Sequence, residues 1–421
     1  MHECMNFIFE DLENCTNFIK CPDVNRSGIR RFTTSPMTQS IVFNGRFSMF
    51  GLRSFNRIAF NKEKMPEHYI ITTAVNHHPN DWASTSCFSQ LNETYLKDLQ
   101  EGRAMILFDQ SFEGYQTSWL WEYFHEDCKK YNIPPQALIY TTGNMLCAEQ
   151  YKSWADEKNI TDRMTAIPYS HFEPDVNGMA KDLKLDISFK KQIKYKTSNV
   201  DKIKTYNCLQ KRLRAHRIWF YIYLYKANLL DDGLVSMNKY DSSAGYFEGQ
   251  FLPSELVDAA NDKLPLLVYG KNNNEYDDNY YIRRIVDQVY LDTWVSVISD
   301  ASFGDQDGTL FLSEKVYKPI ACFHPFIIMG NKGSLKKLRE MGYRTFDGFI
   351  DESYDELPTF ERFDAIIEAI KKINAIEDKL SWFKGMEEIL IHNRKVLNSN
   401  AAKFNPAYAE LENCYKGYFN V

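Results

Sequence analysis

The segment Ser313-Glu314-Lys315, followed by Lys318, carries the most suggestive chemistry in the sequence. Serine is a preferred N-cap residue, so Ser313 predicts the start of a helix that carries a carboxylate and two ammonium groups near its N-terminus. Backbone N–H groups at a helix N-terminus bind phosphate, and Glu314 can accept two hydrogen bonds from a ribose diol. The segment predicts a nucleoside-diphosphate site, although an ordinary capped helix with solvated lysines shows the same features.

A second cluster of cations precedes an aromatic segment, in the sequence QKRLRAHRIWFY (210–221). Arginine binds phosphate through a planar fork that lysine cannot form. Arg217, nearest the expected helix start, is the first candidate for a phosphate ligand, and Arg214 is the next. Asn238 closes a short predicted strand at 233–238 and is a further candidate for contact with the ligand. Solvated turn residues would produce the same cluster.

The first half of the chain alternates between short aliphatic runs and longer amphipathic stretches. This alternation predicts a parallel sheet with right-handed crossovers. The predicted helices cover 112–132 and 145–159, and the predicted strands cover 68–75, 104–110, 136–143 and 165–169.

A lysine-rich stretch at 181–207 is interpreted as a boundary region, after which the alternation resumes. We expect an acceptor-side domain over 1–195 and a nucleotide-sugar-binding domain over 196–356. Helices over 357–421 are candidates for packing back across both domains. The predicted strands of the second series are 233–238, 264–270, 293–300 and 325–330, and its predicted helices are 213–230, 280–292, 313–323 and 334–342. The predicted fold class is α/β, with two Rossmann-like domains that face a cleft, the outline called GT-B in glycosyltransferases.

Residues 210–345 resemble the family 10 fucosyltransferases, GT-B enzymes that use GDP-fucose. The resemblance rests on the cationic helix start, the strand TWVSVISD, the SEK segment and the strand PFIIMG, in this order. It implies that Glu314 and Lys315 contact the nucleotide and that Arg217 binds phosphate. The sequence departs from the family at Ser299-Asp300-Ala301 and at Lys318-Pro319, which leaves the base and the sugar of the donor open.

An inverting sugar transfer needs a base for the acceptor proton and cations for the departing diphosphate. Glu113, which follows a predicted strand, is the first candidate for the base, and Asp109 is the second. Helix capping and the helix dipole would also explain these two carboxylates. Weaker candidates are His77, His78 and His171.

Two metal-binding motifs overlap the loop before Ser313. Asp305-Gln306-Asp307 matches the DxD motif of GT-A glycosyltransferases, and the same aspartates with Glu314 partly match an EF-hand loop. Phe303 occupies the position of the first EF-hand ligand, and the preceding segment is a predicted strand. We therefore expect no metal and no cofactor besides the nucleotide-sugar substrate.

Composition and the absence of certain motifs argue against several classes of protein. The net charge of −6 over 421 residues argues against a strongly basic nucleic-acid binder. No apolar run approaches the ~20 residues of a membrane span, and the N-terminus is acidic and has no cleavage site, so we expect a soluble cytoplasmic protein. The nine cysteines are scattered without zinc-ligand spacing. GxxxxGK[ST] and an HRD/DFG set are absent, which disfavours a kinase.

The leading hypothesis is a glycosyltransferase that acts on a glycan or another hydroxyl acceptor. The lysines and arginines between 181 and 217 could bind a DNA backbone, so a DNA acceptor of the kind glycosylated in some bacteriophages is a further alternative. An alternative from another class is a GT-B-shaped module without catalysis that recognises glycans or partners through its 26 Tyr and seven Trp.

Overall fold

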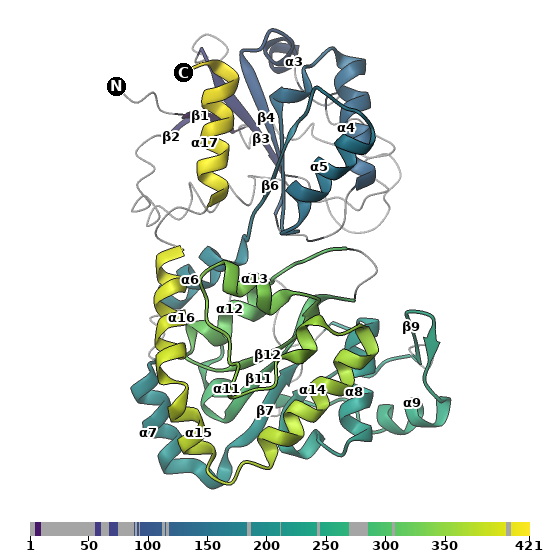
Figure 1. The fold of residues 1–421 in the computed structure, drawn as a ribbon, viewed down its shortest axis with the longest axis vertical. Helices are drawn as coiled ribbons and strands as arrows, with labels where there is room; N and C mark the ends of the chain where they lie inside the picture. The colour runs from purple at the N-terminus through teal and green to yellow at the C-terminus, as the bar shows by residue number, and fades with distance from the viewer. Residues whose placement is uncertain are drawn as a thin grey trace. The chain divides into compact units, whose positions relative to one another are not determined.

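The described part of the chain forms two compact units (Figure 1). Unit 1 comprises Met1–His171 and Asn400–Val421, and unit 2 comprises Phe172–Ser399. The computed structural model describes residues 5–9, 55–59, 67–74, 93–111, 118–182, 187–210, 212–241, 245–268, 285–304, 308–400 and 406–421, together with Phe88, Leu91 and Gly114.

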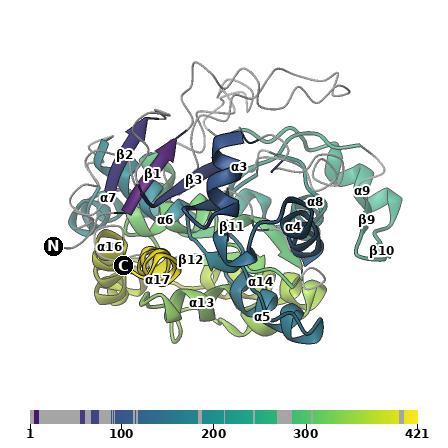
Figure 2. The ribbon, with the colours of Figure 1, turned by 90° about the horizontal axis from the view of Figure 1, so that it is seen from above.

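Unit 1 is built on a sheet of six parallel strands in the order β2-β1-β3-β4-β5-β6. β2, β1 and β3 lie next to one another in Figure 2. The strands are β1 Met5–Phe9, β2 Phe55–Ala59, β3 Tyr69–Ala74, β4 Ala104–Gln110, β5 Leu138–Thr142 and β6 Thr165–Pro168. The helices are α3 Glu93–Gln100, α4 Ser118–Tyr131, α5 Cys147–Glu157 and α17 Pro406–Phe419, with a 3₁₀ turn η4 at Pro135–Ala137.

Both faces of this sheet are buried along β3 to β6, where successive side chains of each strand point to opposite faces. Ile106 and Phe108 of β4 pack in a core with side chains of α3, α4 and α5. Met105 and Leu107 pack in a second core that includes side chains of α17. Figure 1 shows α17 and the pair α4 and α5 on opposite sides of the sheet. Burial on both faces explains why the strands are continuous apolar runs in the sequence.

Unit 2 has a sheet of four parallel strands in the order β12-β11-β7-β8. They are β7 Lys204–Leu209, β8 Gly233–Ser236, β11 Thr293–Gly304 and β12 Phe326–Asn331, and a two-stranded hairpin pairs β9 Tyr246–Phe247 with β10 Gln250–Phe251. The helices are α6 Phe172–Asp182, α7 Phe189–Asn199, α8 Ala215–Lys226, α9 Ser254–Asn261, α11 Asp287–Leu291, α12 Glu314–Ala321, α13 Ser334–Glu340, α14 Thr359–Asn374, α15 Lys379–Gly385 and α16 Glu387–Asn400, and the 3₁₀ turns are η5 Val200–Lys202, η6 Leu230–Asp232 and η9 Ser353–Glu356.

Aromatic side chains join the helices of unit 2 to its sheet. Phe363 of α14 stacks on Phe303 of β11, with ring centroids 4.7 Å apart, and it also contacts Phe220 of α8. Trp294 at the other end of β11 contacts Phe383 of α15. Large rings bury much apolar area, so these contacts fix where both ends of β11 lie.

The lysine-rich stretch at 181–207 is not a boundary, and that prediction was wrong. It contains α7 and most of β7, both within unit 2. Lys196 of α7 is completely buried, and its Nζ donates to the carbonyls of Tyr290, Leu291 and Thr293 at 3.1, 3.0 and 2.5 Å. Burial holds the pKa of Lys196 well below its usual range. A lysine that serves as a buried donor to helix and strand carbonyls has the same sequence signal as a solvated one.

The predicted strand at 264–270 was also wrong for the residues described there. Leu266 forms only an isolated bridge with Met237. α12 contains Pro319, which has no backbone N–H to donate, and this helix is short and ends at Ala321.

The α/β class, with two Rossmann-like units and C-terminal helices, is confirmed. That the two units face a cleft stays a prediction. Among the described helices, none is long and apolar enough to cross a bilayer. The described cysteines are free thiols: Cys128, Cys147, Cys208, Cys322 and Cys414.

Candidate functional site

The candidate site lies at the carboxyl edge of the unit 2 sheet, where β7 and β11 are neighbours. The chain leaves β7 toward β8 on one side and reaches β11, then β12, on the other, so this is the point where the strand order reverses. Ligands of open α/β sheets bind outside the strand ends at such a point. The residues that follow β7 and those at the end of β11 are therefore the ones in position to contact a ligand.

The buried carboxylate of Asp300 organises this edge. Its side chain accepts hydrogen bonds from the backbone N–H of Ala301 at 2.6 Å and of Ser313 at 3.3 Å, and from the Ser313 hydroxyl. Burial raises the pKa of Asp300, although Lys315 and the Ser313 hydroxyl oppose the rise. The register of β11 with β12 shifts between Ser299 and Gly304, which is a β-bulge that can re-aim side chains in this stretch.

Ser313 caps α12, as its position in the sequence predicted. Its hydroxyl accepts a hydrogen bond from the backbone N–H of Lys315 at 3.3 Å, while its own N–H and hydroxyl point to Asp300. The expectation of free N–H groups at this helix start is therefore not met at these positions. The charged side chains, rather than the helix N-terminus, are the groups left to attract a phosphate.

Glu314, Lys315 and Lys318 lie together on α12. Lys315 Nζ is 2.6 Å from Glu314 Oε1, and the Lys315 side chain is 30% exposed. Burial alone raises the pKa of Glu314, but Lys315 and Lys318 outweigh it and lower this pKa to about 2. Burial lowers the pKa of Lys318 to about 8 against the opposing effect of Glu314. At neutral pH the three side chains therefore carry one net positive charge.

Arg217 stabilises the strand end from inside. It is 3% exposed, and its guanidinium donates to the carbonyls of Asp300 at 2.9 Å and Arg212 at 3.2 Å. Burial lowers its pKa to about 10, so it remains charged. Arg214 is only half-buried and donates to the carbonyl of Ala301. Of the two arginines, Arg214 is the one whose position leaves it closer to solvent.

His216 adds a neutral aromatic ring behind the arginines. Its Nε2 lies 3.2 Å from the carbonyl of Asp300, and its ring stacks on Phe303 with centroids 5.6 Å apart. Burial and the neighbouring Arg217 lower the pKa of His216 to about 3. The imidazole is therefore uncharged at neutral pH and can donate from Nε2 to the carbonyl.

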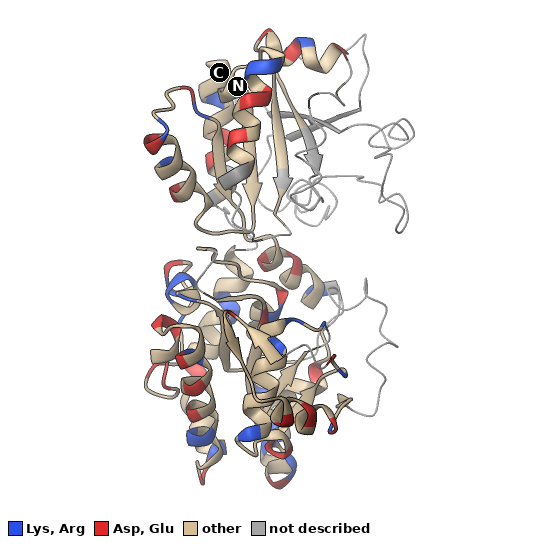
Figure 3. Cartoon of the chain, turned by 90° about the vertical axis from the view of Figure 1, so that its right-hand side faces the viewer, with Lys and Arg blue, Asp and Glu red and all other residues tan. Residues whose placement is uncertain are grey.

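The site carries an excess of two positive charges. By formal charge, four cations outnumber two carboxylates, and the charges of this cluster shift the pKa values of Arg217, Glu314 and His216. The cations are Arg214, Arg217, Lys315 and Lys318, against Asp300 and Glu314. On the face that Figure 3 shows, basic and acidic residues are otherwise interspersed along the described helices. A local excess at a strand edge attracts an anion such as a diphosphate.

Sequence reasoning missed two buried residues that shape this edge. Arg362 of α14 donates to the carbonyls of Gly330 at 2.8 Å and Leu357 at 2.6 Å. Asp355 caps α13, because its carboxylate accepts from the N–H groups of Leu335 and Lys336 at 3.0 and 3.1 Å. The contact of Arg362 with Gly330 and those of Asp355 with α13 have no local signal in the sequence, since they join segments that are distant along the chain.

The remaining predicted site residues are placed only in part. Asn238 is half-buried and follows β8. The backbone of Asp109 lies in β4 beside Thr141 of β5, but its side chain is outside the described residues. Glu113, His77, His78, Asp305 and Asp307 are also outside them. His171 is 5% exposed. In the part of the chain that the structure describes, no group of three or more His, Cys, Asp or Glu side chains is arranged to hold a metal.

No family model, that of the family 10 fucosyltransferases included, and no curated protein matches the sequence. Several solved structures are similar. An alpha,alpha-trehalose-phosphate synthase (UDP-forming) from Burkholderia vietnamiensis has 11% identity and a TM-score of 0.45, and the similarity covers 85% of this chain and 75% of that chain. The corresponding enzyme from Burkholderia xenovorans, in complex with glucose-6-phosphate, has 8% identity and a TM-score of 0.42, with 83% and 73% covered. A UDP-GlcNAc 2-epimerase from Neisseria meningitidis, bound to UDP-GlcNAc, has 9% identity and a TM-score of 0.32, with 99% and 98% covered. At this identity a similarity concerns the backbone, so function has to be inferred from the side chains of the site.

Proposed function

We propose that this protein is a glycosyltransferase that moves a sugar from a nucleotide-diphosphate sugar to an acceptor hydroxyl. The observation that carries the proposal is the excess of two positive charges at the strand-order reversal of unit 2, beside the carboxylate of Glu314. A diphosphate matches the cations, and a ribose diol matches the carboxylate. One nucleotide would thus use both kinds of group.

The proposed roles follow from exposure. Lys315, Lys318 and Arg214 are the partly exposed cations and bind the diphosphate, with Asn238 at the neighbouring strand end. Arg217 supports them by holding the carbonyl of Asp300. The resemblance to family 10 favours a GDP-sugar such as GDP-fucose as the donor.

The proposed chemistry is an inverting transfer without a metal. Cations that face the diphosphate stabilise the negative charge that develops on it as the bond to the sugar breaks. A carboxylate of unit 1 takes the proton of the acceptor hydroxyl, with Glu113 as the first candidate and Asp109 as the second. The acceptor is a glycan or another hydroxyl compound.

Thermal unfolding of the full chain with GDP, UDP, CMP and TDP tests donor binding first. A ligand at about 100 times its Kd stabilises the native state by about 2.7 kcal/mol, which raises the melting temperature by several degrees. The matched controls are the free nucleosides and the Lys315→Ala variant, in which the shift should shrink. The proposal would be contradicted if none of the nucleotides raised the melting temperature of the wild-type protein. If one of them does, its base identifies the sugar nucleotides to use in a transfer assay.

A further inference from the structure

Unit 1 contains a surface hollow that plays no part in the site described above. It has a volume of about 510 Å³ and lies along α5, beside α4. We call it the α5 groove. Its lining includes two indoles, two carboxylates, an amide and a hydroxyl, from Trp121, Glu149, Gln150, Ser153, Trp154 and Glu157. A hollow of this size accommodates a small organic ligand.

The aromatic wall of the α5 groove is held in place by its neighbours. The rings of Trp121 and Trp154 meet edge to face with centroids 5.7 Å apart, and Tyr151 contacts both at 5.4 and 5.9 Å. The Tyr151 hydroxyl accepts from the N–H of Met164 at 3.0 Å and lies 2.9 Å from His125 Nε2. Trp154 is half-buried, so part of its ring remains open to a ligand without rearrangement of the cluster.

The polar groups of the groove are of two opposite kinds. Glu149 and Glu157 are exposed, and an ionised carboxylate only accepts hydrogen bonds. Gln150 and Ser153 carry an amide N–H₂ and a hydroxyl, and both of these groups can donate. The lining therefore combines groups that only accept with groups that can donate.

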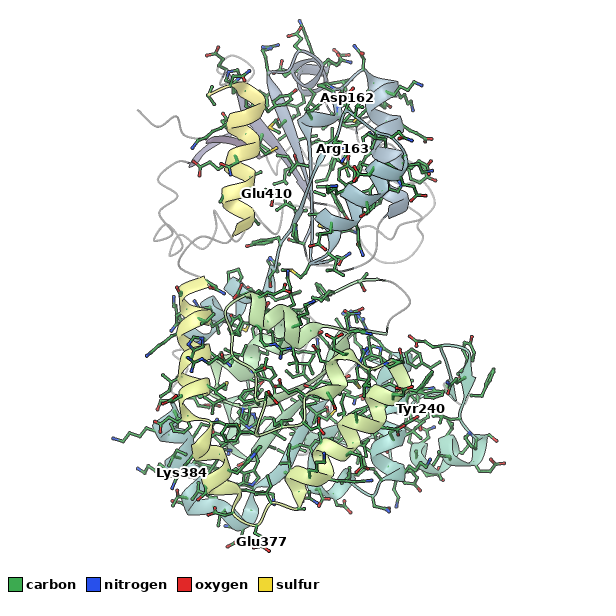
Figure 4. All side chains as sticks on the ribbon, viewed as in Figure 1. Asp162, Arg163, Tyr240, Glu377, Lys384 and Glu410 are labelled. Carbon is green, nitrogen blue, oxygen red and sulfur yellow. The ribbon has the colours of Figure 1, made fainter. Side chains whose placement is uncertain are left out.

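The cations nearest along the sequence are engaged outside the lining. Lys152 Nζ lies 2.7 Å from the carboxylate of Asp156, and Nη2 of Arg163, which is labelled in Figure 4, lies 2.6 Å from it. Lys158 Nζ lies 4.0 Å from Glu122 Oε1. None of the lining side chains is cationic. The two glutamates therefore disfavour an anionic ligand.

We propose that the α5 groove binds a neutral carbohydrate. A sugar ring has C–H faces that pack on the indole of Trp154, hydroxyl hydrogens for the two carboxylates, and hydroxyl oxygens that accept from the Gln150 amide and the Ser153 hydroxyl. A polyamine would suit the glutamates, but its ammonium groups have no lone pair for these two donors. The proposal does not depend on the transferase activity, because a sugar can bind here whether or not the site in unit 2 transfers one.

The test uses the full chain labelled with ¹⁵N-tryptophan, whose seven indole N–H signals report on each ring separately. Trp121→Phe and Trp154→Phe assign two of these signals. The probes are maltotriose, cellotriose and fully N-acetylated chitotriose as neutral sugars, and spermidine as the cationic alternative. We expect at least one sugar to shift the signals of both Trp121 and Trp154. Shifts with spermidine alone, or no shift with any sugar up to its solubility limit, would overturn the proposal.

Two variants measure the contributions to sugar affinity. Trp154→Ala should weaken binding about tenfold, the size of a lost aromatic contact. Because this change disturbs the aromatic cluster, the double variant Glu149→Gln/Glu157→Gln keeps the shape and removes only exposed charges. It should weaken binding severalfold, since hydrogen bonds to a carboxylate are about twice as strong as neutral ones.

Glu126→Gln is the matched control, because this exposed glutamate of α4 does not line the groove. Sugar affinity of the double variant equal to that of Glu126→Gln would refute the groove as the site. Nucleotide-induced thermal shifts of the same variants should equal those of the wild type. A failure of the sugar proposal is thereby distinguished from a failure of nucleotide binding in unit 2.

Discussion

Glu314→Gln removes a carboxylate of α12 that Lys315 and Lys318 stabilise in its charged form. Glu314 is 8% exposed, and its pKa is about 2 instead of the ordinary 4.5. Burial acts to raise this pKa, but Lys315 and Lys318 lower it more. Because the folded-state pKa lies below the ordinary value, the unfolded chain binds more protons between these two pH values. The carboxylate therefore stabilises the fold fully above about pH 5, and this contribution is lost as the pH falls toward 2.

The size of the contribution follows from the same two values. At about 1.4 kcal/mol for each pH unit, the difference corresponds to roughly 3 kcal/mol in the free energy of unfolding of unit 2. Glu314→Gln should lose roughly this amount at pH 7 and much less at pH 3. The variant should bind nucleosides more weakly, because one acceptor for the ribose diol is gone. The net charge of the site becomes more positive by one unit, which favours the diphosphate.

Urea unfolding at several pH values between 3 and 7 measures the effect, with Trp219, Trp294 and Trp382 as fluorescence reporters in unit 2. Glu340→Gln is the control, since Glu340 is 51% exposed and pairs with Lys337 at 3.2 Å on the surface of the same unit. A surface pair contributes only about 0–1 kcal/mol. Parallel pH profiles for wild type and Glu314→Gln would show that the lysines do not stabilise this carboxylate.

Four further outcomes can be checked. Lys315→Ala should weaken nucleoside-diphosphate binding about tenfold or more, the value of a charge-assisted hydrogen bond, and leave nucleoside binding almost unchanged by calorimetry; equal losses would argue against phosphate contact. Arg217→Met should lower the free energy of unfolding by about 2 kcal/mol in urea titrations because buried carbonyls lose their donor, and an unchanged midpoint would contradict this role. Transfer activity should persist in EDTA, and loss reversed only by manganese or calcium would point to a metal. Glu113→Gln should slow transfer ~10²-fold without changing donor affinity. Wild-type turnover in this variant would exclude Glu113 as the base. Asp109→Asn is the control, since it should reduce stability instead of rate if that carboxylate caps a helix.

The strands of unit 1 from β3 onward were predictable because both sheet faces are buried. The run at 104–110 matches β4 at both ends, since continuous apolar residues between polar turns leave little choice of boundary. β7 was missed because Lys204 and Asn207 interrupt its apolar pattern. Asn207 is nonetheless buried, and its Nδ2 donates to the hydroxyls of Thr293 and Ser296 at 2.8 and 2.9 Å. Such compensation between two strands cannot be inferred from either segment alone.

Some features of the candidate site were also predictable from the sequence, and others were not. The cap at Ser313 was predictable, because an N-cap acts on the residues directly after it. The hydrogen bond of Ser313 to Asp300 was not, because these residues are 13 positions apart and meet only in the folded chain. Arg217 was correctly identified as a residue of this edge, but its burial beneath backbone carbonyls follows from tertiary packing.

Unit 1 is assembled from two distant parts of the polypeptide, with all of unit 2 encoded between them. The face of its sheet formed by Ile70, Met105 and Leu107 is covered by α17, which the ribosome synthesises after the whole of unit 2. This apolar face of unit 1 therefore stays uncovered until α17 has been translated, after all of unit 2. During that interval the unfinished sheet is the part of the molecule most exposed to aggregation and to capture by chaperones.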